Sequence, residues 1–155
     1  MASKHDTAIA SEIISRFGAK PERLLQVLHA FMQRYGYIGE EAMRQIASEL
    51  NLSRAEVHGV VSFYHDFRTD PPGKHVLKIC QSEACQAMGS RELTALAEKK
   101  LGVKLGSTSA DGAFSLEPVY CLGLCACSPA LMVDGKVYSR VNNDSLDNLL
   151  EDCGD

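Results

Sequence analysis

The chain has 155 residues, of which 45% are hydrophobic and 23% are charged. These are the proportions of an ordinary globular protein, and they exclude wholesale disorder. The formal net charge is −4 at pH 7, and neither the part before Gly73 nor the part after it is basic. A nucleic-acid partner is therefore not expected, because binding to phosphates needs a cationic surface. The length suits one domain, or a domain with a small helical extension.

No segment has the pattern of a targeting signal or a membrane anchor. The first residues lack the basic segment and apolar run of a secretory signal. The longest uncharged stretch, residues 118–133, is short and is interrupted by Gly123, Ser128 and Pro129, so no membrane span and no direct membrane contact are expected. We therefore expect a cytoplasmic protein. Its six cysteines are then poor candidates for disulfides, because that compartment is reducing, and metal binding is the leading explanation for them.

The first seventy residues carry no cysteine and have the apolar periodicity of helices. Apolar side chains recur at helical spacing in four stretches, residues 9–17, 24–35, 43–50 and 57–64. Pro21 suits the first position of the second helix. Ser53 and Glu56 have the spacing of a capping box, which predicts the start of the fourth. This part is expected to be a helical segment.

The sequence Asp70-Pro71-Pro72-Gly73 ends the helical pattern, because two prolines and a glycine break a helix. Short apolar strands are then predicted over residues 76–79, ending at Cys80, and over residues 114–120, ending at Cys121. Between them lies a predicted helix with Ser90 as its cap and Gly102 as its end.

The last predicted elements complete a small mixed structure. The dipeptide Asp134-Gly135 between two apolar runs predicts a β-hairpin. Leu146, Leu149 and Leu150 have the spacing of a final helix. The order strand, helix, strand, hairpin, helix predicts an α/β or α+β sandwich, with helices covering a small sheet.

Four of the six cysteines form two close pairs. Four residues separate Cys80 from Cys85, and three separate Cys121 from Cys125. Each pair begins where a predicted strand ends, in an expected loop, so two strands ending at one sheet edge would bring the pairs together. Four soft thiolates supply two terminal ligands to each iron of a [2Fe–2S] cluster. Gly123, inside the second pair, permits backbone conformations that turn N–H groups toward sulfur.

The spacing of these cysteines alone does not exclude other roles for them. Structural zinc is the main alternative, although four-cysteine zinc sites usually show pairs separated by two residues. A redox dithiol of the C-x-x-C type is absent from the sequence. Cys127 lies two residues after Cys125, so its position does not exclude it as the fourth ligand, although a buried apolar role suits it. Cys153 is expected to be a free thiol in a frayed terminus.

Residues 46–57 resemble the turn of a DNA-binding helix pair. From residue 40 to residue 66, however, the only basic side chains other than histidine are Arg44 and Arg54, against five acidic ones. This stretch lacks the cationic phosphate contacts that supply most nonspecific affinity for DNA. A helical hairpin used for packing or docking is the expected role.

No pattern for substrate chemistry is present. The sequence has no phosphate-binding glycine loop, no nucleophile elbow and no His-Glu metal helix. It therefore indicates a redox centre without a catalytic site of its own.

Several short motifs, in order, carry a resemblance to a known family. They are Leu28-His29, Gly36-Tyr37-Ile38, Ile46-Ala47, residues 59–64 (Gly-Val-Val-Ser-Phe-Tyr), Gly73-Lys74-His75, residues 111–114 (Asp-Gly-Ala-Phe) and residues 121–125 (Cys-Leu-Gly-Leu-Cys). Over about residues 24–150 the chain resembles the 24-kDa-type subunit of respiratory complex I, the E subunit in bacteria, which is a thioredoxin-like [2Fe–2S] ferredoxin.

The resemblance implies a cofactor, its ligands and a fold. The cofactor is one [2Fe–2S] cluster, and its ligands fall on Cys80, Cys85, Cys121 and Cys125, with Cys127 outside the set. The implied fold is α/β, with an N-terminal helical segment (residues 1–72) followed by a thioredoxin-like [2Fe–2S] ferredoxin domain (residues 73–155).

Two stretches narrow the resemblance. Residues 61–68 (Val-Ser-Phe-Tyr-His-Asp-Phe-Arg) and residues 83–89 (Glu-Ala-Cys-Gln-Ala-Met-Gly), together with residues 121–129, are similar to the gamma subunit of soluble NAD-dependent formate dehydrogenases. This implies an oxidoreductase subunit with no substrate chemistry of its own. Its immediate partner would be an FMN- and NAD-binding diaphorase-type beta subunit, and through it a molybdenum or tungsten formate dehydrogenase alpha subunit.

The equivalent subunits of complex I and of NAD-reducing hydrogenases share most of these motifs and are alternatives. An alternative of another class is a zinc-stabilised scaffold module.

Overall fold

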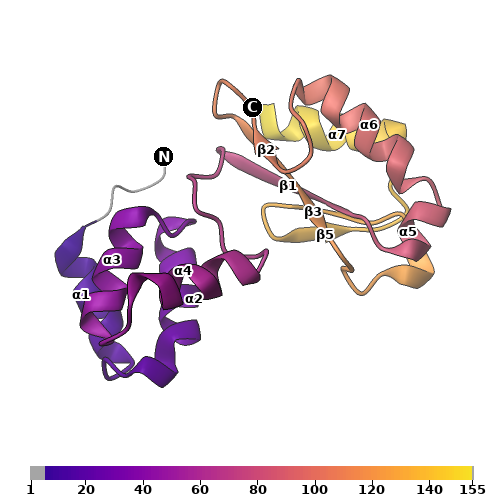
Figure 1. Ribbon diagram of the computed structural model, residues 1–155. Helices are drawn as coiled ribbons and strands as arrows, with labels where there is room; N and C mark the ends of the chain where they lie inside the picture. Colours follow the sequence, from indigo (N-terminus) through magenta and orange to yellow (C-terminus); the bar gives the residue numbers. More distant parts are fainter. Residues whose placement is uncertain (1–5, 155) are drawn as a thin grey trace. The chain divides into compact units, whose positions relative to one another are not determined.

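The structure, a computed structural model, describes residues 6–154. It divides into two compact units, Met1–Pro72 and Gly73–Asp155, which are drawn in indigo to magenta and in magenta to yellow (Figure 1). The first unit is helical. Its elements are α1 (Thr7–Arg16), the 3-10 turn η1 (Pro21–Arg23), α2 (Leu24–Tyr35), α3 (Glu40–Glu49) and α4 (Arg54–Phe63).

Local capping explains where the helices of the first unit begin and end. The Ser53 side chain accepts from the Glu56 N–H at 3.2 Å, and the Glu56 carboxylate accepts from the Ser53 N–H at 2.8 Å, so the predicted capping box is confirmed. Gly36 ends α2 with φ 79°. Pro21 begins the 3-10 turn before α2 and not α2 itself, which corrects its predicted place.

The apolar stripes of these helices meet in one core. Its fully buried members include Ile14, Val27, Leu28, Phe31, Ile46, Leu50 and Val57. Burying one large aliphatic or aromatic side chain contributes about 1.5–3 kcal/mol, so this packing outweighs the weak intrinsic helix preference of short segments. The predicted helical periodicity of this unit is confirmed.

The second unit is a five-stranded sheet with helices packed on it. Its elements are β1 (His75–Cys80), α5 (Glu83–Ala87), α6 (Ser90–Leu101), β2 (Ser107–Thr108), β3 (Phe114–Val119), the 3-10 turn η2 (Cys125–Cys127), β4 (Leu131–Val133), β5 (Lys136–Tyr138) and α7 (Asn143–Gly154). The strand order is β2-β3-β1-β4-β5. The strands β1 and β3 pair in parallel, and the other neighbours are antiparallel.

Helices α6 and α7 lie beside each other on this sheet (Figure 1). Leu93 of α6 and Leu146 of α7 are buried in the same cluster as Leu77, Leu116 and Leu131 of the strands. The sheet therefore shares one core with these two helices. The predicted α/β fold class, with a helical N-terminal segment, is confirmed.

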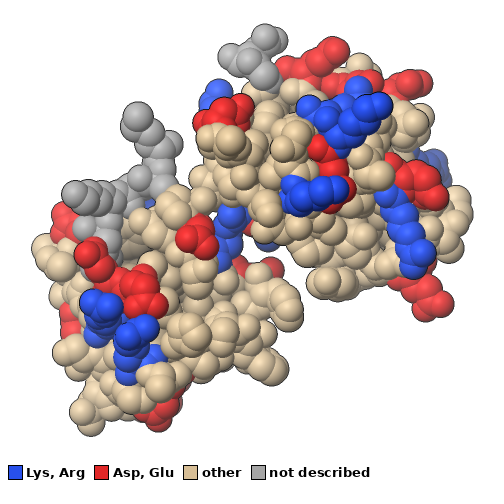
Figure 2. Space-filling model, turned by 45° about the horizontal axis from the view of Figure 1, so that its top comes forward, with Lys and Arg blue, Asp and Glu red and all other residues tan. Residues whose placement is uncertain are grey.

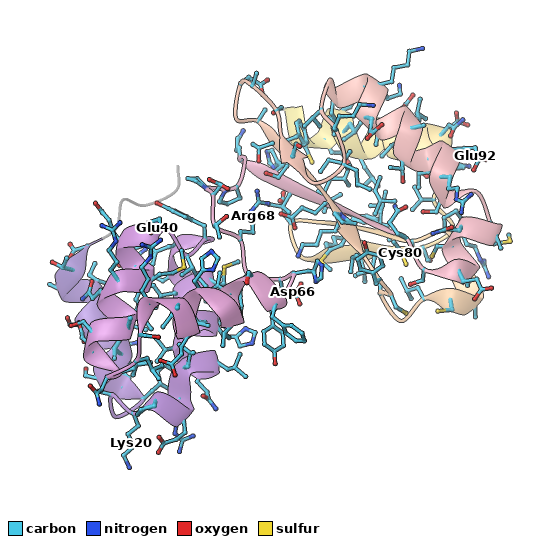
Figure 3. All side chains as sticks on the ribbon, viewed as in Figure 1. Lys20, Glu40, Asp66, Arg68, Cys80 and Glu92 are labelled. Carbon is cyan, nitrogen blue, oxygen red and sulfur yellow. The ribbon has the colours of Figure 1, made fainter. Side chains whose placement is uncertain are left out.

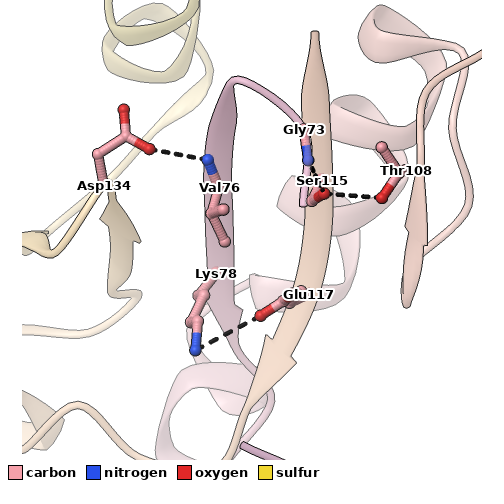
Figure 4. A network of polar contacts seen from close by, with 7 residues as sticks. All are labelled: Gly73, Val76, Lys78, Thr108, Ser115, Glu117 and Asp134. Carbon is pink, nitrogen blue, oxygen red and sulfur yellow. Dashed lines mark hydrogen bonds and ion pairs between the residues drawn. The ribbon is translucent and has the colours of Figure 1, made fainter. Parts of the chain in front are cut away.

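Polar contacts along the edges of β1 hold its register (Figure 4). The Gly73 N–H donates to Ser115 Oγ at 2.8 Å, and Lys78 pairs with Glu117 at 3.4 Å. On the other side, the Val76 N–H donates to Asp134 Oδ1 at 2.8 Å. These contacts fix β1 between β3 and β4.

Two features of the second unit differ from the sequence-based expectation. The cap of α6 is Gly89, at φ 97°, and not Ser90, whose buried hydroxyl instead donates to the Cys80 carbonyl. The short helix α5 replaces a predicted loop. Within residues 6–154, no helix has both the length and the hydropathy needed to cross a bilayer.

Candidate metal centre

The two parallel strands β1 and β3 bring the cysteine pairs to one edge of the sheet. Cys80 is the last residue of β1 and stands opposite Val119, the last residue of β3. Figure 3 shows Cys80 at this end of the strand. Cys121 follows β3 by two residues. The prediction that both strands end at one edge is confirmed.

The first pair is held by regular structure. Cys80 ends a central strand, and Cys85 lies in α5, not in a loop as expected. Both residues are 1% exposed and pack with the buried Ala130. Strand and helix thus fix both thiols inside the protein.

The second pair lies in an exposed turn. The Sγ atoms of Cys121 and Cys125 are 3.6 Å apart, and both residues are exposed. Cys121 and Gly123 have positive φ, 128° and 75°, and the Gly123 N–H donates to Cys121 Sγ at 3.3 Å. The expected role of Gly123 in turning an N–H toward sulfur is confirmed.

The pKa of the Cys80 thiol is shifted by burial and by its neighbours. Burial raises its pKa, but hydrogen bonds from the hydroxyl and N–H of Ser82, from the Cys85 thiol and from the Leu122 N–H outweigh burial, so the pKa lies below its ordinary value. Leu122 belongs to the loop of the second pair. A backbone group from one cysteine loop therefore supports a sulfur of the other.

Neighbouring thiols also shift the pKa values of Cys85 and Cys125. Burial, with the contact to Cys80, raises the pKa of Cys85, although the Ala130 N–H opposes this. The pKa of Cys125 is raised chiefly by its contact with Cys121, and also by the charge of Cys80. The charge of a thiolate in one pair therefore raises the pKa of a thiol in the other. A cation or a metal cluster would relieve the repulsion between these thiolates.

The other two cysteines, Cys127 and Cys153, are partly buried. Cys127 ends η2 and is partly buried, and its carbonyl accepts a hydrogen bond from the Arg140 N–H at 2.8 Å. The sequence predicts Cys153 in a frayed terminus, but this residue lies in α7 and packs partly buried against the core of the sheet. Leu149 and Leu150 of the same helix also pack against this core. The expectation of a frayed terminus at Cys153 is therefore wrong.

The residues that support Cys80 were not evident from sequence patterns. Ser82 is the N-cap of α5, and its hydroxyl and N–H lower the pKa of the Cys80 thiol. The Ser90 hydroxyl donates to the Cys80 carbonyl. A signal was present for Ser82, since serine two residues after a strand end is a common helix cap. For Ser90 the sequence pattern predicts a helix cap, and this prediction is wrong.

The helix pair α3–α4 has no cationic face for DNA among the described residues. Arg44 and Arg54 both lie beside Glu40, at 3.7 Å and 3.1 Å. On the face of each unit visible in Figure 2, basic and acidic side chains are mixed. Each arginine is paired with a carboxylate, which leaves little free positive charge on α3 and α4 to attract phosphates.

Comparisons with known proteins find relatives over most of the chain. Over residues 10–154 the chain matches the family of thioredoxin-like [2Fe–2S] ferredoxins. The E subunit of the NADH-quinone oxidoreductase of Aquifex aeolicus is 35% identical over 139 residues, covering 90% of this chain and 87% of the relative. The HndA subunit of the NADP-reducing hydrogenase of Solidesulfovibrio fructosivorans is 32% identical over 139 residues, covering 90% and 81%.

A solved structure shares the fold. The NAD+-reducing [NiFe]-hydrogenase in the air-oxidized state superposes with a TM-score of 0.74 at 23% identity, over 85% of this chain. The chain spans 23% of that hydrogenase chain. With a family match across both units and relatives above 30% identity, the chain belongs to the thioredoxin-like [2Fe–2S] ferredoxin family, whose cofactor is a [2Fe–2S] cluster.

Proposed function

We propose that Cys80, Cys85, Cys121 and Cys125 bind one [2Fe–2S] cluster and that the chain is an electron-transfer subunit. The observation that carries this proposal is the convergence of two cysteine pairs, distant in sequence, at the shared end of β1 and β3. A [2Fe–2S] cluster accepts and returns single electrons at a potential set by hydrogen bonds to sulfur and by solvent exposure.

The residues around the cysteines fit such a cluster. All four donors are soft thiolates, two for each iron. The Gly123 N–H donates to Cys121 Sγ, and the Leu122 and Ala130 N–H groups favour the charged forms of Cys80 and Cys85. Donors to sulfur stabilise the added negative charge of the reduced cluster. Cys127, whose backbone is tied to Leu124 and Arg140, is left out of the proposed ligand set.

The uneven exposure of the two pairs suits transfer to a partner. The first pair is buried, which holds the cluster and shields it from water, while Cys121 and Cys125 open to the surface. Tyr120, next to Cys121 in the chain, is 67% exposed, and Met88, three residues after Cys85, is 61% exposed. We propose that a redox partner approaches this edge, since electron transfer needs close approach of the two centres.

We propose that the partner is a flavoprotein of an NAD-linked complex. The relatives are named as subunits of NADH-quinone oxidoreductase and of an NADP-reducing hydrogenase, which supports an oxidoreductase assembly in general. Within that class, the motifs at residues 61–68 and 83–89 favour a formate dehydrogenase. There the chain would exchange electrons with an FMN-containing diaphorase-type subunit, itself joined to a molybdenum or tungsten alpha subunit.

Co-purification tests this proposal. The full chain, carrying an affinity tag, is isolated from its own cells without oxygen, and the eluate is assayed for flavin and for NAD+ reduction with formate or with hydrogen. We expect a flavoprotein and formate-dependent NAD+ reduction. Hydrogen-dependent reduction, or NADH–quinone activity, would assign the chain to one of the alternative complexes. Absence of any flavoprotein would contradict an electron-transfer role.

A zinc-stabilised scaffold is the candidate of another class. It predicts the same convergence of thiols but a single metal ion and no sulfide. Neither cysteine pair has the two-residue separation typical of zinc knuckles. Metal analysis of the same eluate therefore separates the two candidates.

A further inference from the structure

Three side chains with metal-binding atoms meet at the end of β1 away from the cysteine pairs. They are His75, Asp134 and Cys153, and one ligand atom of each lies within 4.8 Å of the others. His75 begins β1, Asp134 lies in the turn between β4 and β5, and Cys153 is near the end of α7. Because β1 has six residues, roughly 16 Å of strand separates His75 from Cys80.

The imidazole of His75 faces Asp134 through one ring nitrogen. Its Nδ1 lies 2.7 Å from Asp134 Oδ2, and the ring packs at 5.5 Å from that of Phe114. Its Nε2 is buried and has no hydrogen-bond partner among the described residues. A cation held between Nδ1 and Oδ2 would take the place of the proton in this contact, and Nε2 would then carry the ring proton.

The carboxylate of Asp134 is fixed in place but reachable. Its Oδ1 accepts the Val76 N–H at 2.8 Å (Figure 4), and Oδ2 faces His75. The side chain is 45% exposed, so water can enter beside it. The residue itself has φ 48°, a turn conformation that asparagine also adopts. The turn alone therefore does not require a charge at this position.

The thiol of Cys153 completes the group. Burial raises its pKa, and the charges of Asp134 and Asp152 add to this, with Lys74 opposing them. The thiol therefore stays neutral by itself. A bound divalent cation reverses that balance, because it stabilises the thiolate and releases the proton to solvent.

We propose that His75, Asp134 and Cys153 bind one divalent cation of the Zn²⁺ type, at a site separate from the cluster. Imidazole nitrogen, carboxylate oxygen and thiolate sulfur together are the donor set of zinc. Three protein ligands leave a fourth position for water on the exposed side of Asp134. The ion joins the end of α7 to the edge of the sheet.

Zinc uptake by the cluster-loaded full chain tests the site. The protein is incubated without oxygen in excess ZnCl2, gel-filtered, and analysed for zinc and iron. We expect one zinc per chain with iron unchanged, and an affinity lower by at least about tenfold in Cys153→Ser and in Asp134→Asn. Cys127→Ser, which changes another partly buried thiol, should bind zinc as the unaltered chain does. No uptake, uptake only with loss of iron, or equal uptake by Cys153→Ser would overturn the site.

A second measurement uses the unaltered chain, so its result does not depend on whether a variant folds. The rate of alkylation by a maleimide is followed for Cys153 and Cys127 by peptide mass spectrometry, with and without Zn²⁺. The rate at Cys153 should fall at least about tenfold with Zn²⁺, while that at Cys127 stays unchanged. An equal rate at Cys153 in both conditions would show that the ion does not bind there.

Discussion

The two cysteine pairs reach the same edge of the sheet by different means. Cys80 and Cys85 are placed by a central strand and a short helix, and both are buried. Cys121 and Cys125 lie in a turn that depends on two residues with positive φ, and both are exposed. The first pair is set by packing, whereas the second is set by local backbone conformation.

This difference assigns separate tasks to the pairs. In the proposed site the buried pair would give the cluster a fixed base, because its sulfurs move only if β1 or α5 moves. An exposed pair in a turn leaves an edge that a redox partner can approach. Changes at the two pairs should therefore differ in kind, and the following predictions test that difference.

The largest effect is expected from replacing ligands of the buried pair. Cys80→Ser and Cys85→Ser should abolish cluster binding, because a hard oxygen donor replaces a soft one where little water can enter. Cys121→Ser and Cys125→Ser should retain a cluster with an altered spectrum, because solvent reaches that edge. Iron, sulfide and EPR measurements on each variant check this.

Cys127→Ser is the matched control for these four variants. It should keep an unaltered cluster. Loss of the cluster in this variant, with retention in Cys121→Ser, would show that the ligand set is wrong. Equal loss at both pairs would remove the proposed difference between them.

A core substitution beneath the first pair should have the next largest effect. Ile79 is fully buried beside Cys80, and Ile79→Ala should lower the free energy of unfolding by about 2–5 kcal/mol. Leu28→Ala, in the core of the helical unit, should cost a similar amount by the same mechanism. Thermal melts followed by cluster absorbance should show earlier bleaching in Ile79→Ala only. Equal bleaching in both would contradict anchoring of the cluster by β1.

Replacing the glycine in the turn of the second pair should have a smaller effect on stability. Gly123→Ala should destabilise the protein by about 1–2 kcal/mol, because φ 75° is unfavourable for a residue with a Cβ. Gly59→Ala is the control, since Gly59 lies inside α4 with open space around it, and alanine there should stabilise by about 0.5–1 kcal/mol. Urea unfolding of both variants measures whether the free energy of unfolding falls in Gly123→Ala and rises in Gly59→Ala. A neutral Gly123→Ala would show that the turn does not need glycine.

The smallest effect is expected from replacing Glu98 in α6, which should change how stability depends on acidic pH. The N–H of Leu105, and then Lys104, hold the pKa of Glu98 in α6 below its ordinary value of 4.5. Because the folded-state pKa is depressed, the stabilisation is present above pH 4.5 and is lost as the pH falls below it. In Glu98→Gln, the free energy of unfolding should therefore fall less steeply as the pH is lowered through the acidic range. An unchanged slope would show that this carboxylate does not contribute.

Much of this arrangement was predictable from the sequence, because local signals set it. Strand ends marked by Cys80 and Cys121, together with the turn at Asp134-Gly135, follow from periodicity and turn chemistry. A parallel pair of strands then has to place both cysteine loops at one edge. The resemblance to known ferredoxins added the expected ligand set.

What escaped prediction depends on tertiary contacts or on very short elements. Helix α5 has five residues, too few to show a helical period. Ser90 resembles a cap in sequence, but burial beside Cys80 gives its hydroxyl another acceptor. The meeting of His75, Asp134 and Cys153 joins three elements far apart in the chain, and no spacing pattern marks it.

Metal analysis of the full chain tests the central claim, that four cysteines hold one [2Fe–2S] cluster. The chain is purified without oxygen, its iron and acid-labile sulfide are measured, and its EPR spectrum is recorded after reduction with dithionite. We predict two irons and two sulfides per chain and the EPR signal of a reduced [2Fe–2S] cluster. A colourless protein that carries zinc at these cysteines and no sulfide would contradict the account.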